Sequence, residues 1–230
     1  MIQAVLFDID GTLADTTSMI NECYRQVFEH YLGRRYSNAE IMAILSVAGR
    51  PETVIIREKI PEEKVDEAVN LYHSLYAKRL RTEAHLYSGV EKLLSGLLSS
   101  GQKLAIVTGK SRWSSEFTLE KFGIKNFFQA LITGEDVEEP KPSPQGVLRA
   151  VQRLGSDASN TLYVGDATID IKAGRAAGVL TGAALWGATA KEKLLDMKPD
   201  FAFETVQDLE KMVLAGFGPE GHSAATTSDV

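Results

Sequence analysis

An apolar run that ends in two acids lies close to the start of the chain. Residues 5–11 read Val-Leu-Phe-Asp-Ile-Asp-Gly. An unbroken run of this kind is typical of a strand buried on both faces of a parallel sheet. Side chains alternate along a strand, so Asp8 and Asp10 point to the same side, and Gly11 permits a sharp turn with positive φ. The run therefore predicts a carboxylate pair at the carboxyl end of a central strand, where open α/β sheets bind ligands.

The rest of the chain divides into a helical stretch and an alternating stretch. Residues 15–85 have helical periodicity and no convincing strand, and a capping box, Ser37 to Glu40, starts one of the helices. A second capping box, Ser88 to Glu91, opens the stretch in which helices and apolar strands alternate. Strands are predicted at 103–108, 128–133, 161–165, 180–186 and 201–203, the last at a sheet edge.

This pattern predicts an α/β fold with a doubly wound, Rossmann-like parallel sheet. Residues 1–14 and 86–216 form the core, and residues 15–85 form an α-helical domain inserted after the first strand. Residues 217–230 are small, polar and aperiodic, so we expect a flexible tail.

Charge and composition exclude several classes of partner. The net charge of −6 argues against nucleic acid or an anionic membrane surface. No apolar run approaches the roughly 20 residues of a transmembrane helix, and no signal peptide precedes the first strand. The single cysteine, Cys23, excludes an intramolecular disulfide. We therefore expect a cytoplasmic protein.

Polar residues follow several predicted strands, whose carboxyl ends meet at one crevice. Carboxylates about 4 Å apart repel by roughly 4 kcal/mol at an effective dielectric of 20, so a cluster of them needs a cation. Oxygen ligands without nearby His or Cys favour Mg²⁺. With a hydroxyl, a backbone N–H and a lysine, such an ion describes a phosphate site. The residues concerned are Asp8, Asp10, Thr108, Gly109, Lys110, Lys141, Asp166 and Asp170.

Other ligand-binding motifs fail on spacing. Gly109-Lys110-Ser111 resembles the end of a P-loop, but that motif needs a glycine five residues before Gly109, where Leu104 stands. No Gly-x-Gly-x-x-Gly sequence follows a predicted strand, which disfavours a dinucleotide site. The four histidines lack the spacing of metal ligands.

The order of these residues resembles that of phosphatases of the haloacid dehalogenase superfamily. The residues from Asp8 to Thr12 are similar to the first motif of that superfamily, and Thr108-Gly109 to the second. Lys141 is similar to the third motif, and Gly165-Asp166 with Asp170 to the fourth. The helical insertion resembles the C1-type cap of a subgroup that contains phosphoglycolate phosphatases, pyrophosphatases and β-phosphoglucomutases. The resemblance covers about residues 1–214.

The resemblance implies a role for each motif. Asp8 would attack phosphorus to give an aspartyl-phosphate, and Asp10 would protonate the leaving oxygen and then activate water. The Asp8 carboxylate, the Asp10 backbone carbonyl and Asp166 would bind Mg²⁺, with Asp170 orienting water or Lys141. Thr108, the Gly109 N–H and Lys141 would hold the phosphoryl group.

Two departures from the family pattern matter. Ala167 stands where relatives often carry Ser, Thr or Asn, which loosens the loop without removing a motif ligand. The dehalogenases use a single acid in the first motif, so Asp10 weighs against that reaction. The Gly-Thr after Asp10 resembles the phosphatases more than the mutases.

We expect side chains of the cap and its border to determine which substrate binds. Arg50 is a candidate for contact with the substrate, Thr16 for the hinge or the substrate, and Lys110 for an anionic leaving group. Trp113 and Trp186 are interpreted as packing residues rather than substrate platforms.

The leading hypothesis is a Mg²⁺-dependent phosphatase for a small phosphorylated metabolite, with phosphoglycolate or pyrophosphate as first candidates. A phosphosugar mutase similar to β-phosphoglucomutase is the alternative. A more distant one is a non-enzymatic phospho-acceptor signalling module, because receiver domains also join acids, a Thr and a Lys around Mg²⁺. The sequence leaves the oligomeric state open.

Overall fold

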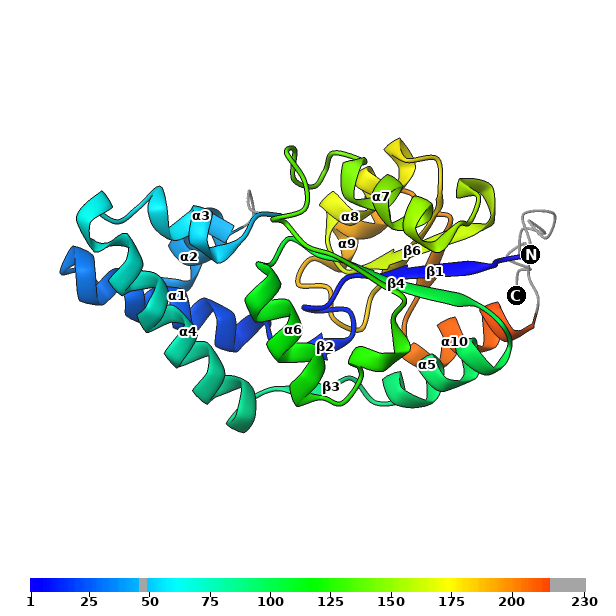
Figure 1. The fold of residues 1–230 in the computed structure, drawn as a ribbon, viewed down its shortest axis with the longest axis horizontal. Helices are drawn as coiled ribbons and strands as arrows, with labels where there is room; N and C mark the ends of the chain where they lie inside the picture. The colour runs from blue at the N-terminus through cyan, green and yellow to red at the C-terminus, as the bar shows by residue number, and fades with distance from the viewer. Residues whose placement is uncertain (46–48, 216–230) are drawn as a thin grey trace, which may run out of the picture.

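The computed structural model describes residues 1–45 and 49–215, and the tail predicted for 217–230 lies outside them. Its centre is a six-stranded sheet in the order β5-β4-β1-β6-β7-β8 (Figure 1), and every neighbouring pair is parallel. The predicted α/β fold with a doubly wound parallel sheet is confirmed. The strands are β1 Ala4–Phe7, β4 Lys103–Val107, β5 Ala130–Ile132, β6 Thr161–Gly165, β7 Leu180–Ala184 and β8 Phe201–Phe203.

Strand β1 is buried on both faces because its side chains enter two different clusters. Val5 and Phe7 pack in one apolar cluster, and Ala4 and Leu6 pack in another on the opposite face. Helices α5 Val90–Ser99 and α10 Val206–Leu214 cover the first face, and α7 Gln145–Leu154 and α8 Thr168–Ala176 cover the second (Figure 1). The chain order reverses between β1 and β6, which is the topological switch point of such a sheet.

The helices inserted after β1 share an apolar core of their own. Helices α1 and α4 pack against each other, with α2 against α1 and α3 against α4 (Figure 1). Their bounds are α1 Thr17–Leu32, α2 Asn38–Leu45, α3 Glu52–Arg57, the 3₁₀ turn η1 Glu62–Lys64 and α4 Val65–Thr82. We call this group the cap.

A small ladder joins the cap to the sheet domain. Strand β2, Ala14–Asp15, pairs antiparallel with β3, His85–Leu86. No strand was expected within 15–85, and Asp15 and His85 at the two ends of that stretch are part of this ladder. Strands of two residues are too short to show an alternating pattern, so no sequence signal marks them.

The two predicted capping boxes had different outcomes. Ser37 and Glu40 exchange hydrogen bonds, with Glu40 accepting from the Ser37 N–H at 2.8 Å and Ser37 Oγ accepting from the Glu40 N–H at 3.3 Å. The box at Ser88 was wrong, because α5 begins after Gly89 at φ 95° and no side chain caps it. A glycine in the left-handed region turns the chain into that helix instead.

The remaining α-helices of the described ranges pack on other helices. Helix α6, Arg112–Lys121, packs on cap helix α4, and α9, Lys191–Asp196, packs on α8.

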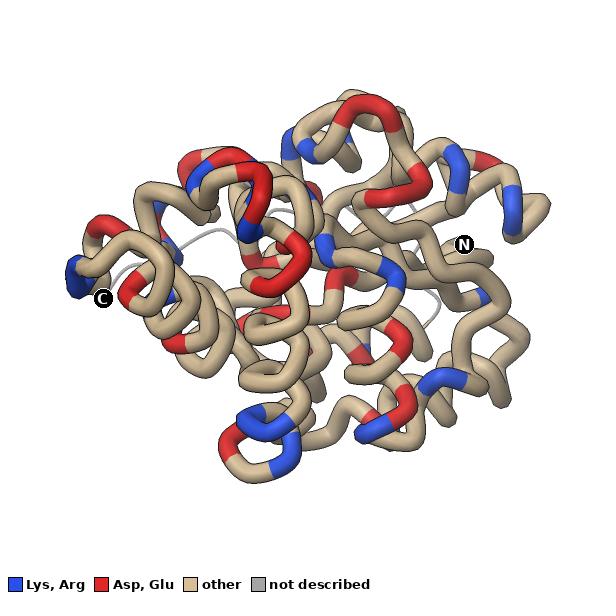
Figure 2. The backbone as a smooth tube through the Cα atoms, turned by 60° about the vertical axis from the view of Figure 1, so that its left-hand side comes forward, with Lys and Arg blue, Asp and Glu red and all other residues tan. Residues whose placement is uncertain are grey.

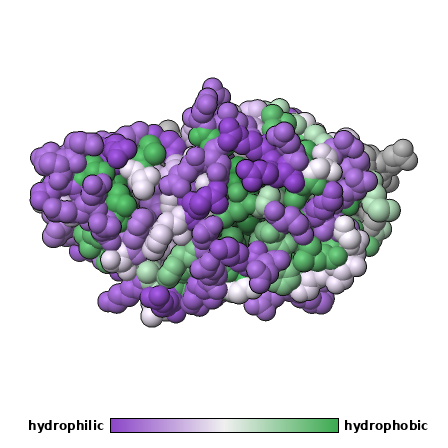
Figure 3. Space-filling model, in the orientation of Figure 1, coloured by the Kyte–Doolittle hydropathy of each residue, from purple (hydrophilic) through white to green (hydrophobic). Residues whose placement is uncertain are grey.

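Hydrophilic residues surround the apolar ones on the face in Figure 3, and basic segments are interspersed with acidic ones in Figure 2. Within the described ranges, no helix has the length and apolar character needed to cross a membrane.

Candidate active site

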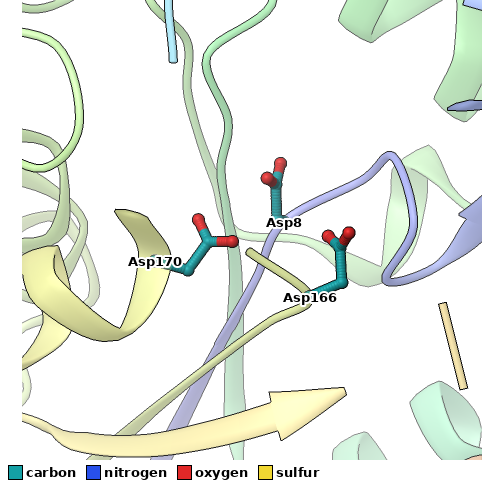
Figure 4. Close-up of side chains that lie close together, drawn as sticks. All are labelled: Asp8, Asp166 and Asp170. Atoms are coloured by element: carbon teal, nitrogen blue, oxygen red, sulfur yellow. The ribbon is translucent and has the colours of Figure 1, made fainter. Parts of the chain in front are cut away.

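Three carboxylates lie together at the carboxyl edge of the sheet. Asp8 follows β1, Asp166 follows β6, and Asp170 lies in the first turn of α8 (Figure 4). One oxygen of each carboxylate lies within 4.8 Å of the others. The sequence predicted this convergence, because the strands that carry these residues are neighbours at the switch point.

The ammonium of Lys141 joins two of these carboxylates. Its Nζ donates to Asp8 Oδ2 at 2.8 Å and to Asp170 Oδ1 at 2.6 Å. Burial lowers the pKa of Lys141, but the Asp170 and Asp8 carboxylates outweigh burial and hold that pKa well above its usual value. Lys141 therefore stays charged in a site where only 8% of its surface is exposed.

The Asp170 carboxylate is fully engaged by protein groups. Besides Lys141, its Oδ1 accepts from the Tyr163 hydroxyl at 2.9 Å, and its Oδ2 accepts from the Ala167 N–H at 3.1 Å. Asp170 therefore fixes Lys141 and the loop after β6, in keeping with the orienting role expected from its motif.

The Asp166 carboxylate carries an unfavourable charge in this arrangement. Burial, followed by the charges of Asp170 and Asp8, raises the pKa of Asp166 well above its usual value. Within residues 1–45 and 49–215, the one side chain that donates to it is Thr12, through its hydroxyl at 3.2 Å. A divalent cation would relieve both the burial and the repulsion, and the donor set of carboxylate oxygens without His or Cys fits Mg²⁺.

Asp10 is held by Thr16, which was expected at the hinge or the substrate, and by Lys110, which was expected at an anionic leaving group. The Thr16 hydroxyl donates to Asp10 Oδ1 at 2.6 Å, and Lys110 Nζ lies 3.0 Å from Asp10 Oδ2. Lys110 also donates to the Tyr76 hydroxyl at 2.6 Å. Burial lowers the pKa of Lys110, but the neighbouring Asp10 and Tyr76 outweigh burial and hold that pKa above its usual value. Thr16 and Lys110 thus fix the orientation of the Asp10 carboxylate.

The loop after β4 brings Thr108 and Gly109 to the same place. Both line the same cavity as Asp8, Asp10 and Asp166, and Thr108 is buried. A Cβ on Gly109 would lie 2.5 Å from the carbonyl carbon of Gly49 in the cap, so only glycine fits where the cap loop crosses. Among the described residues, the Gly109 N–H meets no hydrogen-bond acceptor, which leaves this donor available for an oxyanion.

A cavity of about 250 Å³ separates these loops from the cap. Arg50 lines it, as expected for a residue that selects substrates, but both terminal nitrogens of its guanidinium bind Glu58. The Arg50 Nε has no hydrogen-bond partner among the described atoms. Trp113 stacks on Phe117 at 5.2 Å between ring centroids, and Trp186 donates to the Thr12 carbonyl at 2.9 Å, so both pack as interpreted.

Glu52 is a residue of the site that sequence reasoning missed. It is 3% exposed and lines the cavity. Its carboxylate accepts from Ser111 and Ser114 of the sheet domain, and lies 3.1 Å from His73 Nε2. Burial raises the pKa of Glu52, but hydrogen bonds from His73 and Ser111 outweigh it and lower that pKa to about 2. An acid in the first turn of a short helix gives no sequence signal of such contacts.

The fold and this cluster define a haloacid dehalogenase-like hydrolase. The model of that family matches residues 5–184, and the chain belongs to the family. Its relatives include the pyrophosphatase PpaX of Bacillus velezensis, 32% identical over 208 residues that cover 90% of this chain and 94% of that protein. The pyrophosphatase PpaX of Anoxybacillus flavithermus is 33% identical over 208 residues, covering 90% and 95%.

Solved structures agree with this assignment. A protein of Lactobacillus plantarum proposed to be a phosphoglycolate phosphatase superposes with a TM-score of 0.77 at 26% identity, covering 92% of this chain and 99% of that one. CbbY of Rhodobacter sphaeroides, solved with phosphate, has the same fold, with a TM-score of 0.78 at 20% identity over 91% of this chain and 96% of that one. The chain is a phosphatase of the haloacid dehalogenase-like hydrolases.

Proposed function

We propose that this phosphatase hydrolyses a small phosphorylated metabolite with Mg²⁺ through an aspartyl-phosphate on Asp8. The observation that carries the proposal is the position of the Asp8 carboxylate, which lines the cavity and has Lys141 at 2.8 Å. A carboxylate can approach a phosphate dianion only where cations offset the repulsion. The Asp8 and Asp166 carboxylates and the Asp10 carbonyl would hold Mg²⁺, which supplies charge neutralisation when bound.

The protein groups around Asp8 have complementary tasks. Lys141 and the Gly109 N–H bind phosphoryl oxygens, and Thr108 donates its hydroxyl to the same group. The bond from an Asp8 oxygen to phosphorus forms as the bond to the leaving oxygen breaks. Water then attacks phosphorus, releases phosphate and restores Asp8.

Asp10 moves the protons of both steps. It gives a proton to the leaving oxygen in the first displacement and takes one from water in the second. Its carboxylate is kept in place by Thr16 and Lys110, which bond to it from opposite domains: Thr16 precedes cap helix α1, and Lys110 precedes α6. Closure of the cap and positioning of this acid are thereby linked.

Pyrophosphate and 2-phosphoglycolate are the first substrates to test, because they correspond to the names of the relatives. The alternative is a mutase that returns the phosphoryl group to a sugar phosphate. The non-enzymatic signalling module is excluded, because a hydrolase family spans residues 5–184 and the relatives are enzymes. We place the protein in the cytoplasm, in keeping with its one cysteine, Cys23, which is buried and unpaired.

The test is phosphate release from a panel of phosphorylated metabolites with Mg²⁺, with Asp8→Asn assayed beside the wild type. We expect release by the wild type and none by Asp8→Asn. Inactivity of the wild type on the whole panel, or full activity of the variant, would overturn the proposal. β-Glucose 1-phosphate separates the alternative: isomerised sugar phosphate indicates a mutase, and free phosphate a phosphatase.

A further inference from the structure

The part of the cavity that the cap encloses is lined mainly by apolar side chains. They come from all four cap helices, so the recess enters the apolar core of the cap. The polar neighbours from cap helix α1 are Thr17 and Asn21, which are uncharged. The apolar lining residues are Ile20, Tyr24, Met42, Leu45, Ile55 and Tyr72.

Every cation that lines the cavity within the described residues is already paired. Lys141 binds Asp8 and Asp170, and Lys110 binds Asp10. Arg50 is bound by Glu58 through both terminal nitrogens. Residues 46–48, which precede Gly49, are Ser, Val and Ala and bring no charge by sequence.

The cap contributes one further charge to the lining, and it is negative. Glu52 is ionised, because hydrogen bonds from His73 and Ser111 lower its pKa to about 2 in spite of burial. A leaving group that carries a second phosphate or a carboxylate would be placed beside this carboxylate, in an apolar recess without an unpaired cation. Burial of an unpaired charge is strongly unfavourable, whereas hydrocarbon gains free energy there.

We propose that the substrate is a phosphate monoester of a short, uncharged, largely hydrocarbon alcohol, whose carbon part occupies the apolar recess of the cap. This inference rests on the proposed function. The cavity of about 250 Å³ also contains the space beside Asp8 and Asp166, so the part that remains for the alcohol suits a small molecule. Asn21 and Thr17 can form hydrogen bonds with one additional hydroxyl of the alcohol, besides the oxygen that is esterified to phosphate.

The first experiment compares three phosphate monoesters, whose leaving groups are alcohols, with the phosphoanhydride pyrophosphate. Butyl phosphate and benzyl phosphate are assayed beside 2-phosphoglycolate and pyrophosphate, with Mg²⁺ and the full chain. We expect kcat/KM for butyl or benzyl phosphate at least tenfold above that for 2-phosphoglycolate. A preference for 2-phosphoglycolate or pyrophosphate overturns this inference and leaves the proposed function intact. Absence of Asp8-dependent phosphate release from all four and from the rest of the metabolite panel overturns the proposed function itself.

A variant that adds a cation to the recess gives an independent test. Met42 is partly exposed and lines the cavity, so Met42→Lys places an ammonium there. We expect its ratio of kcat/KM for butyl phosphate over 2-phosphoglycolate to fall at least fivefold. Val54→Lys adds the same charge at an exposed position outside the lining and should leave the ratio unchanged. Thermal melts confirm that both variants fold, and equal ratios in all three proteins contradict the inference.

Discussion

The carboxylate of Glu52, in the first turn of cap helix α3, accepts a hydrogen bond at 3.1 Å from the backbone N–H of Ser111 in the sheet domain. It also accepts from the hydroxyls of Ser111 and Ser114. Ser111 is the N-cap of α6, the helix that follows Thr108 and Gly109. A carboxylate at a helix N-terminus is favourable, so the cap completes the N-terminus of a helix beside the loop that contains Thr108 and Gly109.

The contact between Glu52 and Ser111 predicts a loss of stability and of substrate affinity in Glu52→Gln. The glutamine keeps the shape but loses the charge, and its NH₂ group faces donors. Hydrogen bonds to charged groups contribute about 1.5–3 kcal/mol, which corresponds to a fall in Tm of about 4–10 °C in a chain of this size. We also expect KM to rise more than kcat falls. Glu63→Gln, at an exposed cap position, is the control; equal melting temperatures for the two variants would contradict the role of Glu52.

The same carboxylate predicts a pH dependence. Its pKa lies at about 2 in the folded chain, below the ordinary value of 4.5. A group with a lowered pKa stabilises the fold above its unfolded pKa, and this stability disappears as the pH falls through the folded value. The free energy of unfolding of the wild type should exceed that of Glu52→Gln by a constant amount above pH 5, up to about 3 kcal/mol. The difference should shrink from pH 4.5 towards pH 2, as measured by urea unfolding, and a difference that grows on acidification would refute the prediction.

The sequence predicted the sheet and the order of the catalytic motifs because both are local signals. Apolar runs mark the strands, and parallel strands place their following residues at one edge. These local signals are enough to predict that Asp8, Lys141 and Asp166 lie at one edge of the sheet.

Contacts between residues far apart in the chain could not be predicted. Lys110 reads as a free cation for a leaving group, but its partner, Asp10, is 100 positions away. Glu52 and Ser111 are 59 positions apart, and no periodicity encodes which side chain of a cap helix faces the sheet domain. The contacts of Thr16 and Lys110 with Asp10 could not be predicted for this reason, and the substrate contacts expected of Lys110 and Arg50, which both line the cavity, stay predictions.

The raised pKa of Asp166 predicts that its carboxylate destabilises the metal-free protein and that Mg²⁺ removes this penalty. Burial and the neighbouring charges of Asp170 and Asp8 disfavour its ionised form, so in metal-free protein this carboxylate destabilises the fold near neutral pH and the penalty is relieved as the pH falls. Asp166→Asn should therefore raise the Tm of the protein in EDTA. Mg²⁺ should raise the Tm of the wild type and leave that of the variant unchanged. A variant that is less stable in EDTA and still gains stability from Mg²⁺ would show that Asp166 is not a ligand.

Asp8 and Asp10 are proposed to have different roles in the reaction, so their asparagine variants should have different defects. Asp8→Asn should abolish the acid-stable phosphoprotein formed from ³²P-labelled substrate. Asp10→Asn should retain Mg²⁺ binding by calorimetry, because only its backbone carbonyl is proposed as a metal ligand, while kcat falls by about 10²–10⁴. Loss of Mg²⁺ binding in Asp10→Asn, or a phosphoprotein in Asp8→Asn, would reverse these assignments.

The close approach of Gly187 to the first motif predicts that a single methyl group is damaging there. A Cβ on Gly187 would lie 1.7 Å from the carbonyl oxygen of Gly11 and 2.9 Å from the Tyr87 hydroxyl. Because backbone cannot yield as a flexible side chain does, Gly187→Ala must displace the turn that follows Asp10. We expect a loss of about 1–3 kcal/mol in stability and at least a tenfold loss in kcat/KM. In Gly96→Ala the added Cβ meets Leu214 at an ordinary 3.5 Å, and alanine favours the helix by about 1 kcal/mol. That control should melt at or above the wild-type temperature with unchanged activity, and equal behaviour of the two variants would show that the turn tolerates displacement.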